Sequence, residues 1–558
     1  MKWTRPKGIH RACFIFLSSI LLAACGGGGG GGGPPPTFTV GGTVSGLASG
    51  GSVVLQDNGG DSVTATSNSA FTFPKAITVG GTYQVTIGTQ PSGQTCTVSA
   101  ASGSVTSSNV TSVGVTCIAT THTVGGTVSG LADGSSIVLQ NNGGDLLTVS
   151  ANSTFAFATS IATGSNYSVA ISTQPSYQGC SVVAGSGTVA NADITSVVVH
   201  CPLVQVLWNF GFGLDGEYPE SALIAGSDGN FYGTTKYGGP NIDGTVYEIT
   251  PDGVESVISG FAGGTDGSTV VGGVIQGSDG NFYGTTYVGG ANSLGTVFKV
   301  TPAGVETVLW SFGSGIDGQL PVSGLVQGSD GNFYGTTGAG GSTGYGTVFK
   351  ITPTGAETVL WSFGTGMDGF SPQSGLIQGT DGNLYGTTSL GGTNSRGTVY
   401  KITLSGTETV LWNFDYTTGT VPKGGLVQGV DGNFYGTAAG GGLIGGGTVF
   451  KITPDGALTV IWNFGAGTDG SDPYAGLVQG SDGNFYGTTV AGGTILNSGT
   501  IFKVTPEGVE TVLWDFGFGG NGGFSTVSGL IQGADGNFYG TTDGRGTAND
   551  GTVFKLIP

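Results

Sequence analysis

The chain has 558 residues, of which only 9% are charged, and its formal net charge is −19. A nucleic-acid partner requires a basic stripe, and so acidic a chain is not expected to provide one. The three histidines, His10, His122 and His200, all precede the repeats that begin near residue 204. Catalysis by a histidine base is therefore excluded from the repeat region.

Residues 1–25 are typical of an export signal, because basic residues precede an apolar run at 12–22 that is too short to span a bilayer. Leu22-Ala23-Ala24-Cys25 resembles the cleavage box of bacterial lipoproteins, in which the cysteine carries the lipid. We therefore expect lipidation at Cys25 and anchoring in the bacterial outer membrane or at the cell surface. The alternative is an ordinary signal peptide and a secreted or periplasmic protein. The glycines and prolines of residues 26–36 predict a tether.

Residues 37–119 and 120–202 are two copies of one module, because Thr39–Leu47 returns as Thr123–Leu131. Each copy contains short alternating runs that predict a β-sandwich of six or seven strands. Each also contains two cysteines, Cys96 and Cys117 in the first copy and Cys180 and Cys201 in the second. Four cysteines allow three pairings, and the duplication favours one disulfide inside each copy. Zinc binding is the alternative, although CxxC spacing is missing. The modules look like bacterial immunoglobulin-like or prealbumin-like stalk domains.

Residues 203–558 repeat one phrase, Asp-Gly-Asn-Phe-Tyr-Gly-Thr, at intervals of 50 to 53 residues. The phrase begins at Asp228, Asp279, Asp330, Asp381 (with Leu384 in place of Phe), Asp431, Asp482 and Asp535. Each repeat holds four short runs of Val, Thr and aromatic residues separated by Gly, Pro and Asp, which is typical of strands and tight turns. A period near 50 residues indicates a propeller or a solenoid. We predict an all-β chain in which a seven-bladed β-propeller follows the two disulfide-bonded modules.

The two ends of the repeat region predict how this propeller closes. The run 204–210 matches the fourth strand of a repeat, with no first three strands before it, whereas 529–557 matches the first three strands with no fourth after them. The partial repeats complete each other if the first strand pairs with the last three. Closure also removes the exposed sheet edges that an open solenoid would leave. We therefore expect a three-plus-one closing blade and a monomer.

Variation between the repeats indicates which face binds a ligand. The loops that join the second strand to the third, and each repeat to the next, vary in length and sequence, and they emerge on the same face of an antiparallel blade. Function commonly lies in variable loops on a rigid frame, so we expect an extracellular glycan or protein to bind there. The aromatic candidates are Tyr218, Tyr237, Tyr287, Tyr345, Phe370, Tyr474 and Phe524. The alternative is that they only pack within the loops.

A second candidate set is the glutamine that ends the first strand of a repeat. It occurs as Gln276, Gln327, Gln378, Gln428, Gln479 and Gln532. Because the first strand is innermost in a propeller, these amides could gather at the axial channel. The alternative is that they satisfy backbone groups at the strand edge.

No residue is assigned a catalytic role, and no metal or other cofactor is expected. The Asp-Gly acids Asp215, Asp266, Asp317, Asp368 and Asp469 recur in most repeats, which is more typical of turn formers than of one catalytic acid. A carboxylate-dependent polysaccharide hydrolase or lyase remains an alternative function. A purely structural envelope component is another.

The phrase Asp-Gly-Asn-Phe-Tyr-Gly-Thr-Thr, followed by Gly-Gly and by Gly-Thr-Val-Phe-Lys-Ile-Thr-Pro, resembles the GloVer (Gloeobacter/Verrucomicrobia-type) tandem repeat of bacterial surface proteins. The order of Gly-Gly, aromatic strand and Trp strand is also similar to kelch blades. The resemblance covers the seven repeats. It implies a surface protein with a kelch-like β-propeller, and it implies no enzyme activity.

Overall fold

The computed structural model describes residues 33–175, 178–493, 497–516, 528–544 and 546–558, and every regular element within these ranges is a β-strand. No helix in these ranges is long and apolar enough to cross a membrane. The chain divides after Thr120 into two compact units. The first unit contains the first module, and the second contains the second module and the repeats.

The first module has more strands than the six or seven predicted. Two four-stranded sheets have the orders β5-β2-β10-β8 and β4-β3-β7-β9, and β1 pairs with β6. The strands are β1 (Thr37–Phe38), β2 (Val40–Ser45), β3 (Val53–Asp57), β4 (Asp61–Ala65), β5 (Ala70–Thr72), β6 (Ile77–Thr78), β7 (Thr82–Thr89), β8 (Gln94–Ser99), β9 (Ser102–Ser104) and β10 (Val110–Ala119). The prediction was wrong because strands of two or three residues are too short to show a period of two.

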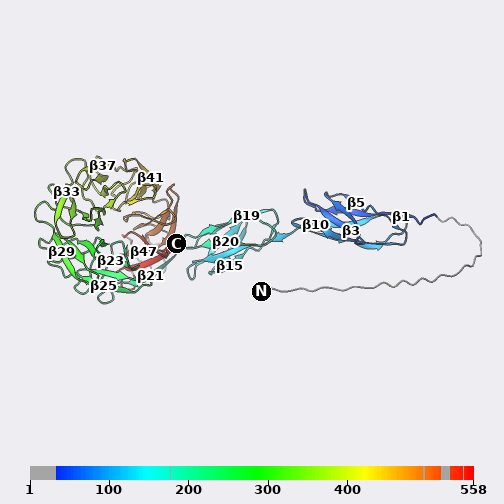
Figure 1. The fold of residues 1–558 in the computed structure, drawn as a ribbon, viewed down its shortest axis with the longest axis horizontal. Coiled ribbons are helices and arrows are strands. Elements are labelled where there is room, and N and C mark those ends of the chain that lie inside the picture. The colour runs from blue at the N-terminus through cyan, green and yellow to red at the C-terminus, as the bar shows by residue number, and fades with distance from the viewer. Residues whose placement is uncertain (1–32, 176–177, 494–496, 517–527, 545) are drawn as a thin grey trace, which may run out of the picture. The chain divides into compact units, whose positions relative to one another are not determined.

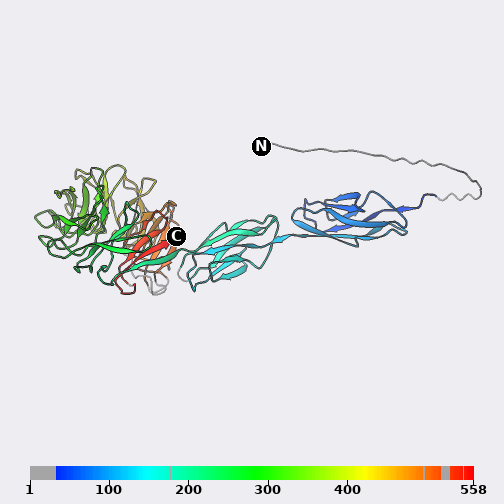
Figure 2. The same ribbon diagram turned by 60° about the horizontal axis from the view of Figure 1, so that its bottom comes forward.

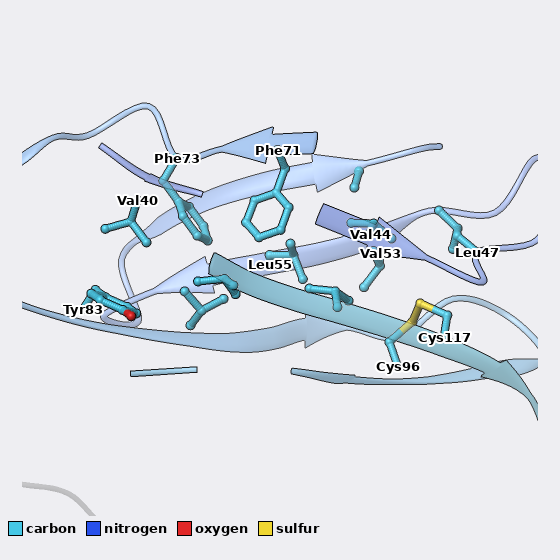
Figure 3. Close-up of a cluster of buried hydrophobic side chains, with 14 of the residues drawn as sticks. Val40, Val44, Leu47, Val53, Leu55, Phe71, Phe73, Tyr83, Cys96 and Cys117 are labelled. Atoms are coloured by element: carbon cyan, nitrogen blue, oxygen red, sulfur yellow. A yellow bond between two sulfur atoms is a disulfide. The ribbon is translucent and has the colours of Figure 1, made fainter. Parts of the chain in front are cut away.

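The core of this module lies between its two four-stranded sheets. Val40 and Leu55 come from opposite sheets and are fully buried, and Phe71 meets Phe73 edge to face at 5.7 Å. Figure 3 shows these side chains together, with the disulfide at one end of the cluster. Cys96 and Cys117 lie directly opposite each other on the antiparallel strands β8 and β10 and are bonded. The disulfide therefore fastens neighbouring strands of one sheet.

The second module repeats this arrangement. Its sheets have the orders β15-β12-β20-β18 and β14-β13-β17-β19, with β11 paired to β16. The strands are β11 (Thr121–His122), β12 (Val124–Ser129), β13 (Ile137–Asn141), β14 (Asp145–Val149), β15 (Thr154–Ala156), β16 (Ile161–Ala162), β17 (Asn166–Thr173), β18 (Ser181–Val183), β19 (Ser186–Thr188) and β20 (Ile194–His200). Cys180 and Cys201 flank β18 and β20 and form the second disulfide, so the pairing follows the duplication.

In the repeat region, the described residues form seven four-stranded antiparallel sheets, which we call blades 1 to 7. In each blade the strands are called a to d in their order across the sheet. Blades 1 to 3 contain β22 (Ile224–Ala225), β23 (Phe231–Thr235), β24 (Thr245–Ile249), β25 (Glu255–Gly260); β26 (Ile275–Gln276), β27 (Phe282–Thr286), β28 (Thr296–Val300), β29 (Glu306–Ser311); and β30 (Val326–Gln327), β31 (Phe333–Thr337), β32 (Thr347–Ile351), β33 (Glu357–Ser362).

Blades 4 to 6 contain β34 (Ile377–Gln378), β35 (Leu384–Thr388), β36 (Thr398–Ile402), β37 (Glu408–Asn413); β38 (Val427–Gln428), β39 (Phe434–Ala438), β40 (Thr448–Ile452), β41 (Leu458–Asn463); and β42 (Val478–Gln479), β43 (Phe485–Thr488), β44 (Thr500–Val504), β45 (Glu510–Asp515). Blade 7 contains β46 (Ile531–Gln532), β47 (Phe538–Thr542), β48 (Thr552–Ile557) and β21 (Leu203–Asn209). Figure 1 shows the blades arranged around a common axis, as in a β-propeller.

The ring closes through its first and last strands. Strand β21 pairs antiparallel with β48, with Leu203 opposite Ile557 and Asn209 opposite Thr552. The red C-terminal strands lie beside β21 in Figure 1 and remain beside it when the view is turned in Figure 2. The first strand of the repeat region therefore supplies strand d of blade 7, which is the closure expected from the two ends of the repeats.

Aromatic contacts join each blade to the next. The tyrosine of strand b meets the phenylalanine of the following strand b, with ring centroids 3.9–4.3 Å apart at six junctions. At the seventh junction Tyr334 faces Leu384 in one buried cluster. The repeated tryptophans lie on strand d, where most of them are half-buried and pack against the hydrophobic clusters between neighbouring blades. The indoles of Trp208, Trp310 and Trp361 also donate hydrogen bonds to the loop after their strand.

Candidate functional site

A cavity of 620 Å³ lies where the b–c and d–a loops come together. The residues that line it are Glu220, Lys236, Tyr237, Thr269, Val271, Tyr287, Val288, Val322, Gln373, Lys423 and Tyr474. They come either from the segment before strand a or from the segment after strand b, in six different blades. The volume is within the range of about 300–1,000 Å³ that is typical of small-molecule sites.

In blades 1 to 6, a residue with positive φ stands two positions before the lining residue that precedes strand a. In blade 1, Tyr218 has a φ of 57° and is followed by Pro219 and then by Glu220. In blade 5, Val421 has a φ of 55° and is followed by a proline and Lys423. A left-handed conformation is unusual for a tyrosine and especially for a β-branched valine, and such strain is concentrated at functional sites. The repeated frame therefore holds these side chains at the cavity at a conformational cost.

Three of the predicted aromatic residues line the cavity. Tyr237 and Tyr287 follow strand b of blades 1 and 2, and Tyr474 precedes strand a of blade 6. Tyr218 supports Tyr237 from the side, since the two rings meet at 85° with centroids 6.1 Å apart. Tyr237 is 41% exposed, so a large part of its ring is available to a ligand.

The other predicted aromatic residues do not line this cavity. Tyr345 and Phe370 pack on each other, with ring centroids 5.1 Å apart. Phe524 lies outside the described residues. The loop-packing alternative thus describes Tyr345 and Phe370, whereas the ligand-face interpretation places Tyr237, Tyr287 and Tyr474 at one site.

The two lysines at the cavity differ in their partners. The Lys236 ammonium lies 2.9 Å from the Glu220 carboxylate. The Lys423 ammonium instead lies over the ring of Tyr474, 4.2 Å from its centroid. Burial, with repulsion from Glu220, raises the pKa of Asp543 to about 6. The cavity therefore combines an ion pair, a second lysine and a nearby carboxyl that titrates close to neutral pH.

A narrower cavity of 290 Å³ continues from the first, and small residues make up most of its wall. Examples are Ser323 and Gly324 in blade 3 and Gly424 and Gly425 in blade 5. Hydrogen bonds between blades fix this wall, as where the Thr285 hydroxyl donates to the Ser323 carbonyl at 2.9 Å. The repeated small residues define an axial channel whose mouth is the larger cavity.

The six glutamines proposed for the channel line neither of these cavities. The side-chain oxygen of each accepts a hydrogen bond of 2.8–3.0 Å from a backbone N–H in the a–b turn of the preceding blade. Gln327, for example, accepts from Ser278 N–H and donates to the Gly331 carbonyl of its own turn. These amides satisfy backbone groups and link neighbouring blades, which is the alternative that the sequence left open.

The Asp-Gly acids act within their own loops. Asp215, Asp317 and Asp368 are buried, and each accepts a hydrogen bond of 3.1 Å from the indole N–H of the preceding tryptophan. Asp266 accepts from the Ala262 N–H. These contacts agree with the interpretation of the acids as turn formers.

Sequence reasoning missed a set of glutamates at the start of strand d. Burial, with repulsion from an aspartate, raises the pKa of Glu255 and Glu510 to about 8 and that of Glu306, Glu357 and Glu408 to about 7. Each has a buried carboxyl oxygen, Oε1, without a hydrogen-bond partner among the described residues. The aspartate is always the Asp-Gly acid of the loop just before the glutamate's blade. In each of these blades, burial and the neighbouring aspartate therefore favour the protonated form of the glutamate.

The sequence did contain a signal for these pairs. Where the loop before blade 5 has Thr418 in place of the aspartate, strand d of that blade has Leu458 in place of the glutamate. Where the loop before blade 7 has Asn521, strand d of that blade has Val204. The acid and its partner are thus gained and lost together across all seven repeats. Among the described residues, no group of three or more His, Cys, Asp or Glu side chains is arranged to hold a metal ion.

Comparison with known proteins adds a family match. The sequence model described as "Gloeobacter/Verrucomicrobia repeat" matches residues 177–393 and 374–558. No curated protein is a match for the chain. Among solved structures, a streptogramin B lyase is 17% identical, with a TM-score of 0.46 over 64% of this chain and 97% of the lyase. A gluconolactonase from Xanthomonas campestris is 10% identical, with a TM-score of 0.35 over 63% and 99%. Likenesses this distant carry no argument about function.

Proposed function

The chain belongs to the Gloeobacter/Verrucomicrobia repeat family, and from this premise we propose that it is a lipid-anchored surface protein that binds an extracellular glycan or protein. The site is the cavity at the channel mouth. One observation supports this most directly: six blades with a common backbone frame direct different side chains, tyrosines among them, into one cavity of 620 Å³. Rigid, amphipathic tyrosines are well suited to contact a ligand at low entropic cost.

The proposed location rests on the signal and the disulfides. Two disulfides fit an oxidising compartment outside the cytoplasm. The lipid would be carried by Cys25, with the modules 37–119 and 120–202 acting as a stalk. Metabolic labelling of the producing cells with an alkyne fatty acid tests the anchor. Label should appear on the full chain and be lost in Cys25→Ser, and equal labelling of both would contradict the proposal.

Binding is tested on a glycan array and on an array of extracellular proteins. Tyr287→Ala and Tyr474→Ala should each weaken any interaction that the unmodified protein shows, by about tenfold or more, because each truncation removes a contact surface. Tyr416→Ala is the matched control, since Tyr416 is 64% exposed and stacks on Arg396 away from the cavity. Unchanged binding in both cavity variants would contradict the proposed site.

A carboxylate-dependent hydrolase or lyase is the second candidate function. The observation that favours it is Asp543, whose pKa is raised to about 6 by burial and by Glu220, beside a lysine. A carboxyl that is protonated near neutral pH can act as a general acid. If this candidate holds, reducing sugar is released from a polysaccharide and the release is lost in Asp543→Asn. Polysaccharide that stays intact over a broad substrate panel would exclude it.

A further inference from the structure

One position in each blade carries the variation at the channel mouth. It is followed by two small residues and then by an aliphatic residue that leads into strand a. These three following residues keep the same character in all seven repeats. The position itself does not: it is Glu220, Val271, Val322, Gln373, Lys423 and Tyr474 in blades 1 to 6. Each of these six residues lines both cavities. A position that varies on a uniform frame and faces the cavity is suited to determine specificity.

Charge along this ring of residues is asymmetric. The negative charge of Glu220 is balanced by Lys236 at 2.9 Å. Lys423 has no carboxylate within 4.0 Å in the described part of the chain, and its ammonium lies over the face of Tyr474. Asp472 is close enough for the charge of Lys423 to act on it, and burial raises the pKa of that carboxyl although Lys423 opposes the shift. Lys423 is therefore the cation at the mouth that remains available for a ligand.

The rest of the lining suits a sugar ring better than an extended apolar group. Tyr287 and Tyr237 offer flat apolar surfaces with a hydroxyl at the edge. Gln373 and Thr269 add hydrogen-bonding groups that can serve as donor or acceptor for hydroxyls. Below the mouth the channel continues as a smaller cavity of 290 Å³, which is lined mostly by small residues such as glycine and serine. The lining thus favours a short saccharide end that rests on the mouth.

We propose that the cavity binds a saccharide unit carrying one anionic group, a carboxylate or a sulfate, and that Lys423 binds this group. The inference rests on the proposed function, because it takes the same cavity as the ligand site. It adds the class of ligand and the residue that selects it. An ammonium binds an anion through charge-assisted hydrogen bonds, which are roughly twice as strong as neutral ones.

The test is calorimetric titration of the full chain with three probes. They are trigalacturonate, its fully methyl-esterified form, which has the same rings without charge, and a singly sulfated galactose trisaccharide. We expect at least one charged probe to bind about tenfold or more tightly than the ester. Lys423→Gln should abolish that difference, and Lys423→Arg should retain it. Lys350→Gln is the matched control, because Lys350 acts on Asp330 in an a–b turn and lines neither cavity.

The outcomes separate this inference from the proposed function. Equal binding of charged and neutral probes, lost in Tyr287→Ala but unchanged in Lys423→Gln, would overturn the anionic ligand and leave the site standing. Binding that neither the tyrosine nor the lysine variants change would overturn both. Failure of all three probes to bind would overturn the saccharide class, and the protein array would then still test the site. Preference for one charged probe over the other identifies carboxylate or sulfate as the group.

Discussion

Tyr539 and Phe231 close the inner aromatic layer of the ring: their ring centroids are 4.1 Å apart, although one belongs to blade 7 and the other to blade 1. The Tyr539 hydroxyl also donates a hydrogen bond of 2.8 Å to Asp535 in its own a–b turn. The same two contacts occur at the junction of blades 2 and 3, which follow each other in the sequence. There the ring of Tyr283 stacks on Phe333 and its hydroxyl donates a hydrogen bond to Asp279. The closing junction thus uses the contacts of an ordinary one.

Truncating this tyrosine should destabilise the ring. Tyr539→Ala removes a buried aromatic ring, for which we expect a loss of about 3–5 kcal/mol in the free energy of unfolding. Tyr539→Phe keeps the stacked ring and removes only the hydrogen bond, so about 1 kcal/mol should be lost. Urea unfolding followed by tryptophan fluorescence measures both. Equal losses in the two variants would show that stacking across the junction contributes nothing.

The glutamine links predict an effect on stability without an effect on binding. Gln327→Ala removes the acceptor for the Ser278 N–H and should cost about 1 kcal/mol. Blade 1 has Ala225 at the equivalent position, so Ala225→Gln should add a seventh link and stabilise the ring by a similar amount. Thermal unfolding of both variants checks this. Ligand affinity should stay unchanged, and a loss of affinity in Gln327→Ala would return the glutamines to the binding site.

The paired carboxyls predict that stability falls as pH rises toward neutral. The folded-state pKa of Glu357 is about 7, above its ordinary value of 4.5, so the folded state binds the extra proton. Its stabilising contribution is complete below about pH 4.5 and is lost by about pH 7. Because the site is partly exposed, we expect a change on the order of 1 kcal/mol for this residue. Melting temperature measured against pH should show the decline.

Glu357→Gln isolates this effect, because the amide does not titrate. The difference in melting temperature between the variant and the unmodified protein should shift in favour of the variant between pH 4.5 and pH 8. Other carboxyls act in the opposite sense at lower pH. Burial opposes the shift, but hydrogen bonds from Asn332 and Tyr334 hold the pKa of Asp330 below its usual range. A pH-independent difference would contradict the raised pKa of Glu357.

The disulfide of the first module should stabilise that module alone. Cys96 and Cys117 are 21 residues apart, and closing a loop of this length contributes about 3 kcal/mol in the chain-entropy description. Replacing both with serine should lower the melting temperature of the module in a calorimetric scan of the full chain. The transition of the second unit, which contains the repeats and keeps Cys180–Cys201, serves as the internal control. If both transitions shifted, the two parts of the chain would not unfold independently of each other.

The repeats made the larger architecture predictable, and the details depended on contacts that one repeat does not reveal. The partial repeats at 204–210 and 529–557 implied the β21–β48 pairing, and the duplication implied both disulfides. Three of the seven aromatic candidates lie at the cavity, because the variable loops come together there. It does not say which loop side chains turn inward. That depends on the left-handed residue before Pro219 and its equivalents, which sequence statistics do not favour.

The glutamines were ambiguous for a different reason. Gln327 binds a backbone N–H in another blade, and a backbone partner leaves no trace in the sequence. The Glu–Asp pairs were readable, since Leu458 accompanies Thr418. The aspartate lies in the loop before the blade, whereas its glutamate lies on strand d of that blade. The two acids therefore fall in different sequence repeats, and they are recognised as partners only when a strand is compared with the loop before its blade.

The pairing of Leu203 with Ile557 also orders events during synthesis. Strand β21 is made before every other part of the ring, yet its partner β48 is made last. Until translation delivers β48, β21 has an unpaired edge and the ring has a gap. The two modules precede β21 and complete their own sheets without it. A nascent chain therefore carries finished modules and an open ring, and chains interrupted before β48 expose an adhesive edge that chaperones and proteases can recognise.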